Sequence, residues 1–270
     1  MIGPNKIAKL PLALALAVSL SASAGAAPAS SGNRSSEPQR KAKASDEKDP
    51  QFQYEKGLIA LRYGLPDEAV RYGKLAVSLD PGNFNGWNLL GLAYYAKGEF
   101  ALAAEAYEKA VAIKPEAAAV QKDLGLTYAE LKDPGKAEAA LKRAYEIDGG
   151  YESAYHLARL YYNAGRFEEA LDYVLKAIQK NGQSAGAYNL KGVVLNELKR
   201  YAEAAGSFRA ALVLAPSDTN LQVNLGIALL NSGEPSKARA VFEAVLPKIE
   251  QDVTRKQVED YIKAIKDAGK

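Results

Sequence analysis

The chain repeats itself every 34 residues, with a single 33-residue step, over most of its length. In each of six copies a small residue recurs at one position, and an alanine follows it twelve positions later. The small residues are Gly57, Gly91, Gly125, Ala158, Gly192 and Gly226, and the alanines are Ala69, Ala103, Ala137, Ala170, Ala204 and Ala238. A fixed period of this length is typical of solenoids, in which each unit buries its apolar face against its neighbours.

The small residues predict pairs of closely packed helices. Antiparallel helices approach each other only where the crossing side chains are small, so we expect each Gly or Ala of a first helix to meet the Ala of the second. Asp49-Pro50 and Asp133-Pro134 are typical helix starts, because the carboxylate caps the helix and proline suits its first position. We expect a short turn inside each hairpin at Gly64, Gly98, Gly165 and Gly233. These features predict an all-α fold.

The segment 84–117 carries a known consensus. Its W…LG…Y…A…F…A…P pattern is formed by Trp87, Leu90, Gly91, Tyr94, Ala103, Tyr107, Ala110 and Pro115. On these residues the chain resembles the tetratricopeptide-repeat (TPR) family over roughly residues 50 to 250. The resemblance implies a right-handed α-solenoid of about six TPR helix-turn-helix units, at 50–83, 84–117, 118–150, 151–184, 185–218 and 219–249.

Several positions depart from the family pattern. Lys56 and Lys191 replace a leucine, Gly73 replaces a large aromatic residue, and Gly149 and Gly182 replace the closing proline. We expect looser packing at these positions.

Residues 1–26 have the composition of a secretory signal peptide. Lys6 and Lys9 precede an apolar run at 10–20, and Ala-x-Ala sequences follow at 22–24 and 24–26. An uncleaved membrane anchor is the alternative, although it requires about 20 apolar residues. We therefore expect export, to a bacterial periplasm or otherwise as a secreted protein, with no stable membrane insertion after cleavage. Because the chain has no cysteine, lipid attachment through cysteine and disulfide bonds are excluded.

Two further segments flank the repeats. Residues 27–48 are polar and of mixed charge, which predicts a flexible tether. At the other end, residues 250–270 predict a capping helix, in which we expect one apolar face to cover the open end of the stack. That face is assigned to Val253, Val258, Tyr261, Ile262 and Ile265.

Charge and composition exclude several partners and chemistries. The formal net charge is +3, and removing the two lysines of residues 1–26 leaves +1, with acidic and basic residues interleaved, so we expect no nucleic-acid partner. With one histidine, His156, and no cysteine, the common zinc ligand sets cannot form, and no phosphate-binding loop occurs, so we expect neither metal nor cofactor. Residues 182–186 read Gly-Gln-Ser-Ala-Gly, a hydrolase-like string, but it spans a repeat junction with no strand before it. We therefore expect no enzymatic activity.

The resemblance implies that the first helices line a concave, peptide-binding side. Carried over by register, the lining residues are Tyr54, Leu58, Arg62, Asn88, Leu92, Tyr95, Lys122, Leu126, Tyr155, Arg159, Tyr162, Asn189, Val193, Asn196, Val223 and Ile227. Amide side chains both donate and accept hydrogen bonds, so Asn88, Asn189 and Asn196 are expected to hold a peptide backbone. The family's carboxylate clamp is not reproduced, because Lys122 is accompanied by Leu126 where an asparagine is needed.

The function that follows is a non-catalytic scaffold or adaptor outside the cytoplasm. It would bind an extended peptide or a helix of a partner protein, in envelope, pilus or secretion assembly. The alternative is an accessory subunit that docks a separate envelope polysaccharide or cell-wall enzyme. Self-association through the ends of the solenoid is a further expectation.

Overall fold

The computed structural model describes residues 48–269, and within this range the regular secondary structure is entirely helical. The elements are α1 (Pro50–Arg62), α2 (Pro66–Leu79), α3 (Phe84–Ala96), α4 (Phe100–Ile113), α5 (Ala118–Glu130), α6 (Pro134–Asp148), α7 (Tyr151–Asn163), α8 (Phe167–Lys180), α9 (Ala185–Glu197), α10 (Tyr201–Leu214), α11 (Thr219–Asn231), α12 (Pro235–Val245), the 3₁₀ helix η3 (Leu246–Lys248) and α13 (Asp252–Ala268). The all-α prediction is confirmed. The predicted signal peptide and nearly all of the predicted tether lie outside the described residues.

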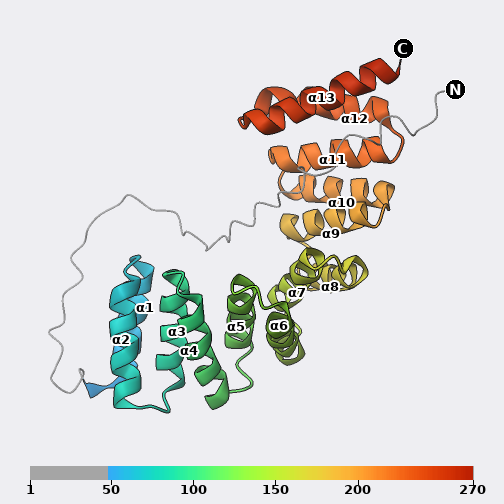
Figure 1. Ribbon diagram of the computed structural model, residues 1–270. Coiled ribbons are helices and arrows are strands. Elements are labelled where there is room, and N and C mark those ends of the chain that lie inside the picture. The colour runs from blue at the N-terminus through green and yellow to red at the C-terminus, as the bar shows by residue number, and fades with distance from the viewer. Residues whose placement is uncertain (1–47, 270) are drawn as a thin grey trace. The chain divides into compact units, whose positions relative to one another are not determined.

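The helices form two compact units, each built from consecutive hairpins (Figure 1). The N-terminal unit contains α1 to α6 and the C-terminal unit contains α7 to α13, with the boundary between Gly149 and Gly150. Within each unit every helix packs against the next one along the chain. First helices also contact each other, α1 with α3 in one unit and α9 with both α7 and α11 in the other. None of the helices between residues 48 and 269 combines the length and apolar character that a membrane span requires.

The small residue of each first helix makes room for a large side chain. A Cβ atom added to Gly91 would lie 2.4 Å from Cε1 of Tyr107, and one added to Gly226 would lie 2.4 Å from Cε1 of Phe242. At these two positions the nearest atoms thus belong to a ring of the second helix and not to the alanine expected there, whereas Gly125 meets Leu141 of α6 and Gly57 meets Leu89 of α3. The small residue therefore leaves room for a bulky side chain that packs against the first helix.

The turns and caps have the predicted chemistry. Gly98 adopts a φ of 75° in the turn after α3, while Lys132 and Lys199 adopt φ values of 58° and 59° in hairpins that have no glycine there. Asp49 Oδ1 accepts a hydrogen bond from Gln51 N at 2.9 Å, and Asp133 Oδ1 accepts one from Lys136 N at 3.1 Å. Local sequence therefore sets where the hairpins begin and turn.

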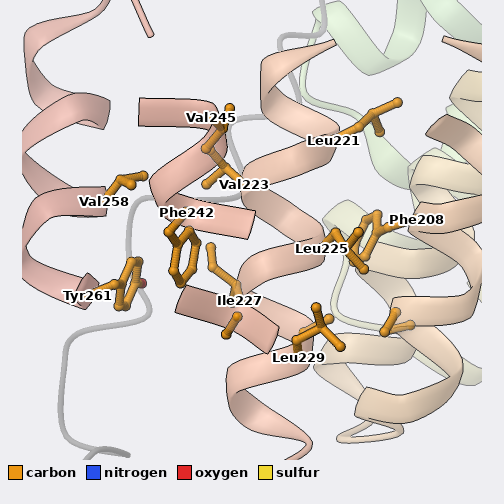
Figure 2. Packing of buried hydrophobic residues seen from close by; sticks show 14 of the residues in the cluster. Phe208, Leu221, Val223, Leu225, Ile227, Leu229, Phe242, Val245, Val258 and Tyr261 are labelled. Atoms are coloured by element: carbon orange, nitrogen blue, oxygen red, sulfur yellow. The ribbon is translucent and has the colours of Figure 1, made fainter. Parts of the chain in front are cut away.

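The C-terminal unit ends in a packed cap, α13 (Figure 2). Tyr261 of α13 stacks on Phe242 of α12 with ring centroids 5.3 Å apart, and Val258, Ile262 and Ile265 are buried with it. The predicted capping helix is confirmed. Val253, however, is 65% exposed. At 100° per residue it lies on the opposite side of α13 from Ile262, so its place in the predicted apolar face is wrong.

The first hairpin has no such cover among the described residues. Ile59 is 44% exposed, Tyr63 is 73% exposed and Leu75 is 40% exposed. The residue that corresponds to Ile59 in the next hairpin, Ala93, is fully buried. Large apolar side chains therefore remain accessible on α1 and α2.

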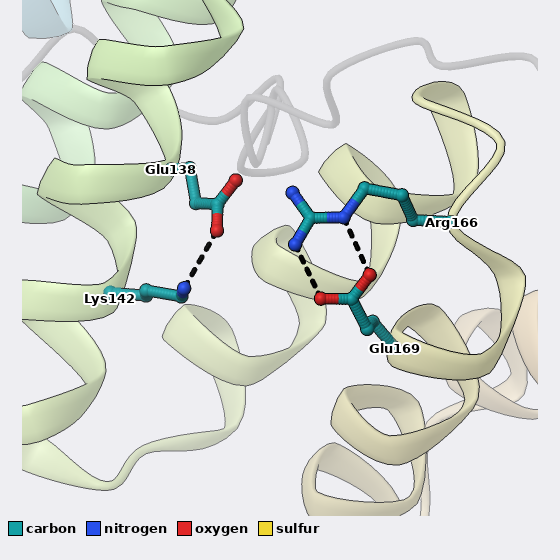
Figure 3. A network of polar contacts seen from close by, with 4 residues as sticks. All are labelled: Glu138, Lys142, Arg166 and Glu169. Carbon is teal, nitrogen blue, oxygen red and sulfur yellow. Dashed lines mark hydrogen bonds and ion pairs between the residues drawn. The ribbon is translucent and has the colours of Figure 1, made fainter.

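Charged side chains form short-range ion pairs on the helix surfaces, as Figure 3 shows for one pair in each unit. In α6, Lys142 Nζ lies 2.7 Å from Glu138 Oε1. At the start of α8, Arg166 Nε donates to Glu169 Oε2 at 2.6 Å. Such exposed pairs contribute little to stability, and they support the interpretation of these charges as solvated surface.

Candidate functional site

The predicted lining residues of the N-terminal unit are all accessible to some degree. They come from the first helix of each hairpin, and we call them together the N-terminal wall: Tyr54, Leu58 and Arg62 of α1, Asn88, Leu92 and Tyr95 of α3, and Lys122 and Leu126 of α5. Arg62 is exposed and the others are half-buried. Half-burial fixes a side chain in place while leaving surface for a partner to cover.

The N-terminal wall combines apolar and amide groups. Leu58, Leu92 and Leu126 occupy the same position in three successive hairpins. Asn88 lies one turn before Leu92 on α3, and within residues 48–269 its buried Oδ1 atom has no hydrogen-bond partner. A buried carbonyl oxygen without a donor is costly, so a ligand N–H that reached this atom would be favoured.

Two tyrosines place hydroxyl groups on the N-terminal wall. The ring of Tyr95 meets the edge of Phe100 at 5.3 Å, which orients it. Burial raises the pKa of Tyr54, so its hydroxyl stays protonated at neutral pH and can donate a hydrogen bond.

In the C-terminal unit, α7 carries an aromatic column. Tyr155 stacks on Tyr151 with centroids 5.7 Å apart and planes 16° apart, and the guanidinium carbon of Arg159 lies 5.9 Å from the Tyr155 ring centroid. Tyr155, Arg159 and Tyr162 are half-buried. Tyr151 was missed by the register argument, although its spacing of four residues from Tyr155 places both rings on one helix face.

Ser184, the serine of the hydrolase-like string, has a structural role. Its Oγ accepts a hydrogen bond from Ala187 N at 3.1 Å as the N-cap of α9, and it shares a 2.7 Å hydrogen bond with the Tyr151 hydroxyl. Helix capping therefore explains the role of Ser184 at this position.

The asparagines of α9 bind α11. Asn189 Oδ1 accepts from Asn224 Nδ2 at 3.3 Å, and Asn196 Oδ1 accepts from Asn231 Nδ2 at 3.4 Å. Asn196 is only 6% exposed. These amides join neighbouring first helices, which differs from the peptide-holding role expected for Asn189 and Asn196. The signal that could have shown it is the recurrence of asparagine 35 residues further on, one more than the repeat.

Val193, Val223 and Ile227 are buried and belong to the hydrophobic core of the C-terminal unit, where Val223 and Ile227 are labelled in Figure 2. The expectation that these three side chains line an open surface is wrong. These side chains pack in one hydrophobic cluster with Phe208 of α10 and Phe242 of α12, which covers them. Although Val223 is buried, it lies at the margin of a polar pocket of about 410 Å³ that Thr219 and Thr254 also line.

Repeated hairpins with facing first helices define the chain as an α-solenoid. Tetratricopeptide-repeat models match residues 88–152, 155–219 and 195–255. The chain belongs to the tetratricopeptide-repeat family, which confirms the resemblance seen in the sequence.

Curated relatives share the repeats but are much longer. Protein FlbA of Caulobacter vibrioides is 32% identical over 168 residues, covering 59% of this chain and 27% of FlbA. BBSome complex member BBS4 of Bos taurus is 22% identical over 72% of this chain and 37% of its own length. A probable UDP-N-acetylglucosamine–peptide N-acetylglucosaminyltransferase of Hordeum vulgare, SPINDLY, is 31% identical over 45% of this chain and 14% of its own length. The chain thus spans well under half the length of these relatives.

Solved structures share the fold. PilF of Pseudomonas aeruginosa has a TM-score of 0.67 at 16% identity, covering 80% of this chain and 99% of that one. PilW, a type IV pilus biogenesis factor, has a TM-score of 0.64 at 16% identity over 77% and 97%. YrrB, described as a TPR protein with an unusual peptide-binding site, has a TM-score of 0.61 at 16% identity over 70% and 97%.

Proposed function

We propose that this chain is a non-catalytic scaffold that binds an extended segment or a helix of another protein on the N-terminal wall. TPR folds generally bind other proteins or peptides. The observation that carries the proposal is the accessible row of Leu58, Leu92 and Leu126 next to the unpaired Oδ1 atom of Asn88.

The chemistry of the wall favours a polypeptide over a small charged ligand. The leucines bury apolar side chains of a partner, and each buried methylene contributes about 0.8 kcal/mol. The Asn88 amide accepts a backbone N–H, a group that every non-proline residue offers. Recognition of this kind depends on backbone and apolar spacing more than on charge.

The proposed setting is outside the cytoplasm, in envelope, pilus or secretion assembly. The charged, apolar and small-residue order of residues 1–26 supports export, and the fold likeness to PilW, a type IV pilus biogenesis factor, supports an envelope context. Sequencing the amino terminus of the exported product is the direct measurement. A start near residue 27 is expected, and a product that begins at Met1 contradicts cleavage.

A second candidate is an accessory subunit that docks a separate enzyme. It is favoured by the matches to transferases, in which the repeats cover 14% of SPINDLY and 18% of Protein O-mannosyl-transferase TMTC1 of Homo sapiens. Repeats of this kind therefore occur in chains that also hold enzymes. The two candidates differ in the partner: an enzyme of envelope synthesis in one, an assembly component in the other.

Site-specific photocrosslinking tests both candidates. A photoreactive p-benzoylphenylalanine replaces Leu92 on the N-terminal wall, and the control replaces Leu102 of α4, which is 42% exposed. We expect a discrete adduct with one partner protein from position 92 and none from position 102, and mass spectrometry of the adduct distinguishes an enzyme from an assembly component. Equal adducts from both positions, or adducts from 102 alone, contradict the assignment of the wall.

We further propose that two copies can pair through the first hairpin. Ile59, Tyr63 and Leu75 are exposed there, whereas α13 covers the last hairpin. An isologous contact would bury the same apolar patch on both copies. Light scattering of the chain and of an Ile59→Lys/Tyr63→Lys variant measures this: a dimer that persists in the variant contradicts the proposed contact.

A further inference from the structure

Arg159 interrupts an apolar series. The ninth residue of the first helix is apolar in every hairpin except the fourth: Leu58, Leu92, Leu126, Arg159, Val193 and Ile227. The position therefore accepts leucine, valine or isoleucine in this fold. An arginine there is not required by the packing of a hairpin.

The Arg159 guanidinium is held in place but has no acceptor. Its Nε atom is buried and has no hydrogen-bond partner in the part of the chain that the structure describes, and the guanidinium carbon lies 5.9 Å from the centroid of the Tyr155 ring. Within residues 48–269 it forms no ion pair, whereas four other arginines of the C-terminal unit pair with a carboxylate three or four residues away. Those pairs are Arg166–Glu169, Arg200–Glu203, Arg239–Glu243 and Arg255–Asp252.

A buried guanidinium N–H without an acceptor is costly, and a carboxylate satisfies it best. The planar fork of the guanidinium matches the two oxygens of a carboxylate, and such bidentate pairs are both strong and directional. The guanidinium also stacks at the end of the Tyr151–Tyr155 column, which restricts its orientation before any ligand arrives.

We propose that α7 of the C-terminal unit also takes part in partner binding, in that Arg159 binds a single carboxylate of a polypeptide segment whose apolar part Tyr155 and Tyr162 cover. The inference rests on the proposed function and adds the chemistry of one partner residue: an Asp or Glu side chain, or the carboxyl terminus. A phosphate dianion is disfavoured because Arg159 is the one cation in this series and a carboxylate, that of Glu197, lies near Tyr162. Burial raises the pKa of Tyr162, and the charge of Glu197 raises it further.

Substitutions at Arg159 distinguish the effect of its charge on binding from the effect of its guanidinium geometry, and both from an effect on folding. Arg159→Leu restores the residue type of the other hairpins and is expected to keep the fold. Arg159→Lys keeps the charge but not the fork. Arg209→Leu, on the exposed surface of α10, removes the same charge elsewhere and is the matched control.

Two libraries of random dodecapeptides serve as probes. One library ends in a free carboxylate, and the other has both peptide ends joined to the display protein. Both are selected on the full chain and on each variant. We expect selected peptides to carry an acidic residue at a fixed position, or a required free carboxylate, on the wild-type chain and on Arg209→Leu.

The affinities of synthetic peptides then give the magnitude. Replacing the selected Glu by Gln, or amidating the carboxyl terminus, is expected to weaken binding about 10- to 100-fold on the wild-type chain and not on Arg159→Leu. Arg159→Lys should fall between the two. Peptides that bind without acidic preference, or with the same preference on Arg159→Leu, overturn the carboxylate site and leave the scaffold function standing. Failure of every peptide to bind counts against the scaffold function itself.

Discussion

The two units use the same repeat positions in different ways. In the N-terminal unit Leu92 is half-buried and the Asn88 Oδ1 atom is unpaired. In the C-terminal unit the equivalent Val193 is fully buried, and Asn189 accepts a hydrogen bond from Asn224. The fifth and ninth positions of the first helix are therefore less completely packed and paired in the N-terminal unit, whereas in the C-terminal unit they hold neighbouring helices together.

A single residue type accounts for the difference in hydrogen bonding. The donor to Asn189 is Asn224, 35 residues further along. The residue at the corresponding distance from Asn88 is Asp123, whose ionised carboxylate accepts hydrogen bonds and cannot donate one. The row of amide pairs that joins α9 to α11 is thus interrupted at Asn88 in the N-terminal unit.

The largest change in stability is expected from replacing the small residue of the first helix, a feature that the two units share. Gly91→Ala and Gly226→Ala each place a Cβ atom 2.4 Å from a ring carbon, so each should lower the free energy of unfolding by about 1–3 kcal/mol. Gly206→Ala is the control, because no described atom outside the adjoining backbone and residues lies within 4 Å of its added Cβ, and removing a helical glycine should stabilise by about 0.5–1 kcal/mol. Urea unfolding measures all three. A loss in one unit only would show that the hairpins are not packed alike.

An intermediate change in stability is expected from substitutions that complete or break the row of amide pairs. Asp123→Asn supplies the missing donor and should stabilise the chain by about 1 kcal/mol, while Asn224→Asp removes the donor to Asn189 and should destabilise it by about 1–3 kcal/mol. Urea unfolding at neutral pH measures both. If the two substitutions change stability in the same direction, the proposed origin of the difference is wrong.

The smallest effect is expected at the surface ion pairs. Lys142→Ala in the N-terminal unit and Glu169→Ala in the C-terminal unit each break one exposed pair, so each should cost about 0.2–1 kcal/mol and less in high salt. Thermal unfolding at low and high ionic strength measures this. A larger, salt-independent loss in either unit would mean that the residue supports packing.

Much of the fold could be predicted from the sequence because its causes are local. The repeat period, the helix caps and the turn glycines predict the hairpins, as at Asp133 and Gly98. Helix periodicity predicts the buried face of α13, except that Val253 is exposed. Register alone could not tell that Val193 is buried while Leu92 is accessible. Burial at this position depends on which side chains the neighbouring helices place around it.

The candidate site was harder to predict for the same reason. The asparagine pairs join residues 35 apart, so a strict 34-residue register does not align them. The unpaired state of Arg159 is visible only once the surroundings of its guanidinium are known. Sequence could identify the face, but not which polar groups on it were already satisfied.

The first hairpin has exposed apolar side chains, whereas the last hairpin is covered by α13. This difference limits how copies of this chain could combine. If α1 and α2 of one molecule met α1 and α2 of another, the contact would use up the exposed patch on both, and α13 would leave no matching patch for a third molecule. Growth would then stop at two. By covering the last hairpin, α13 would act as a terminator and favour a closed pair over a fibre.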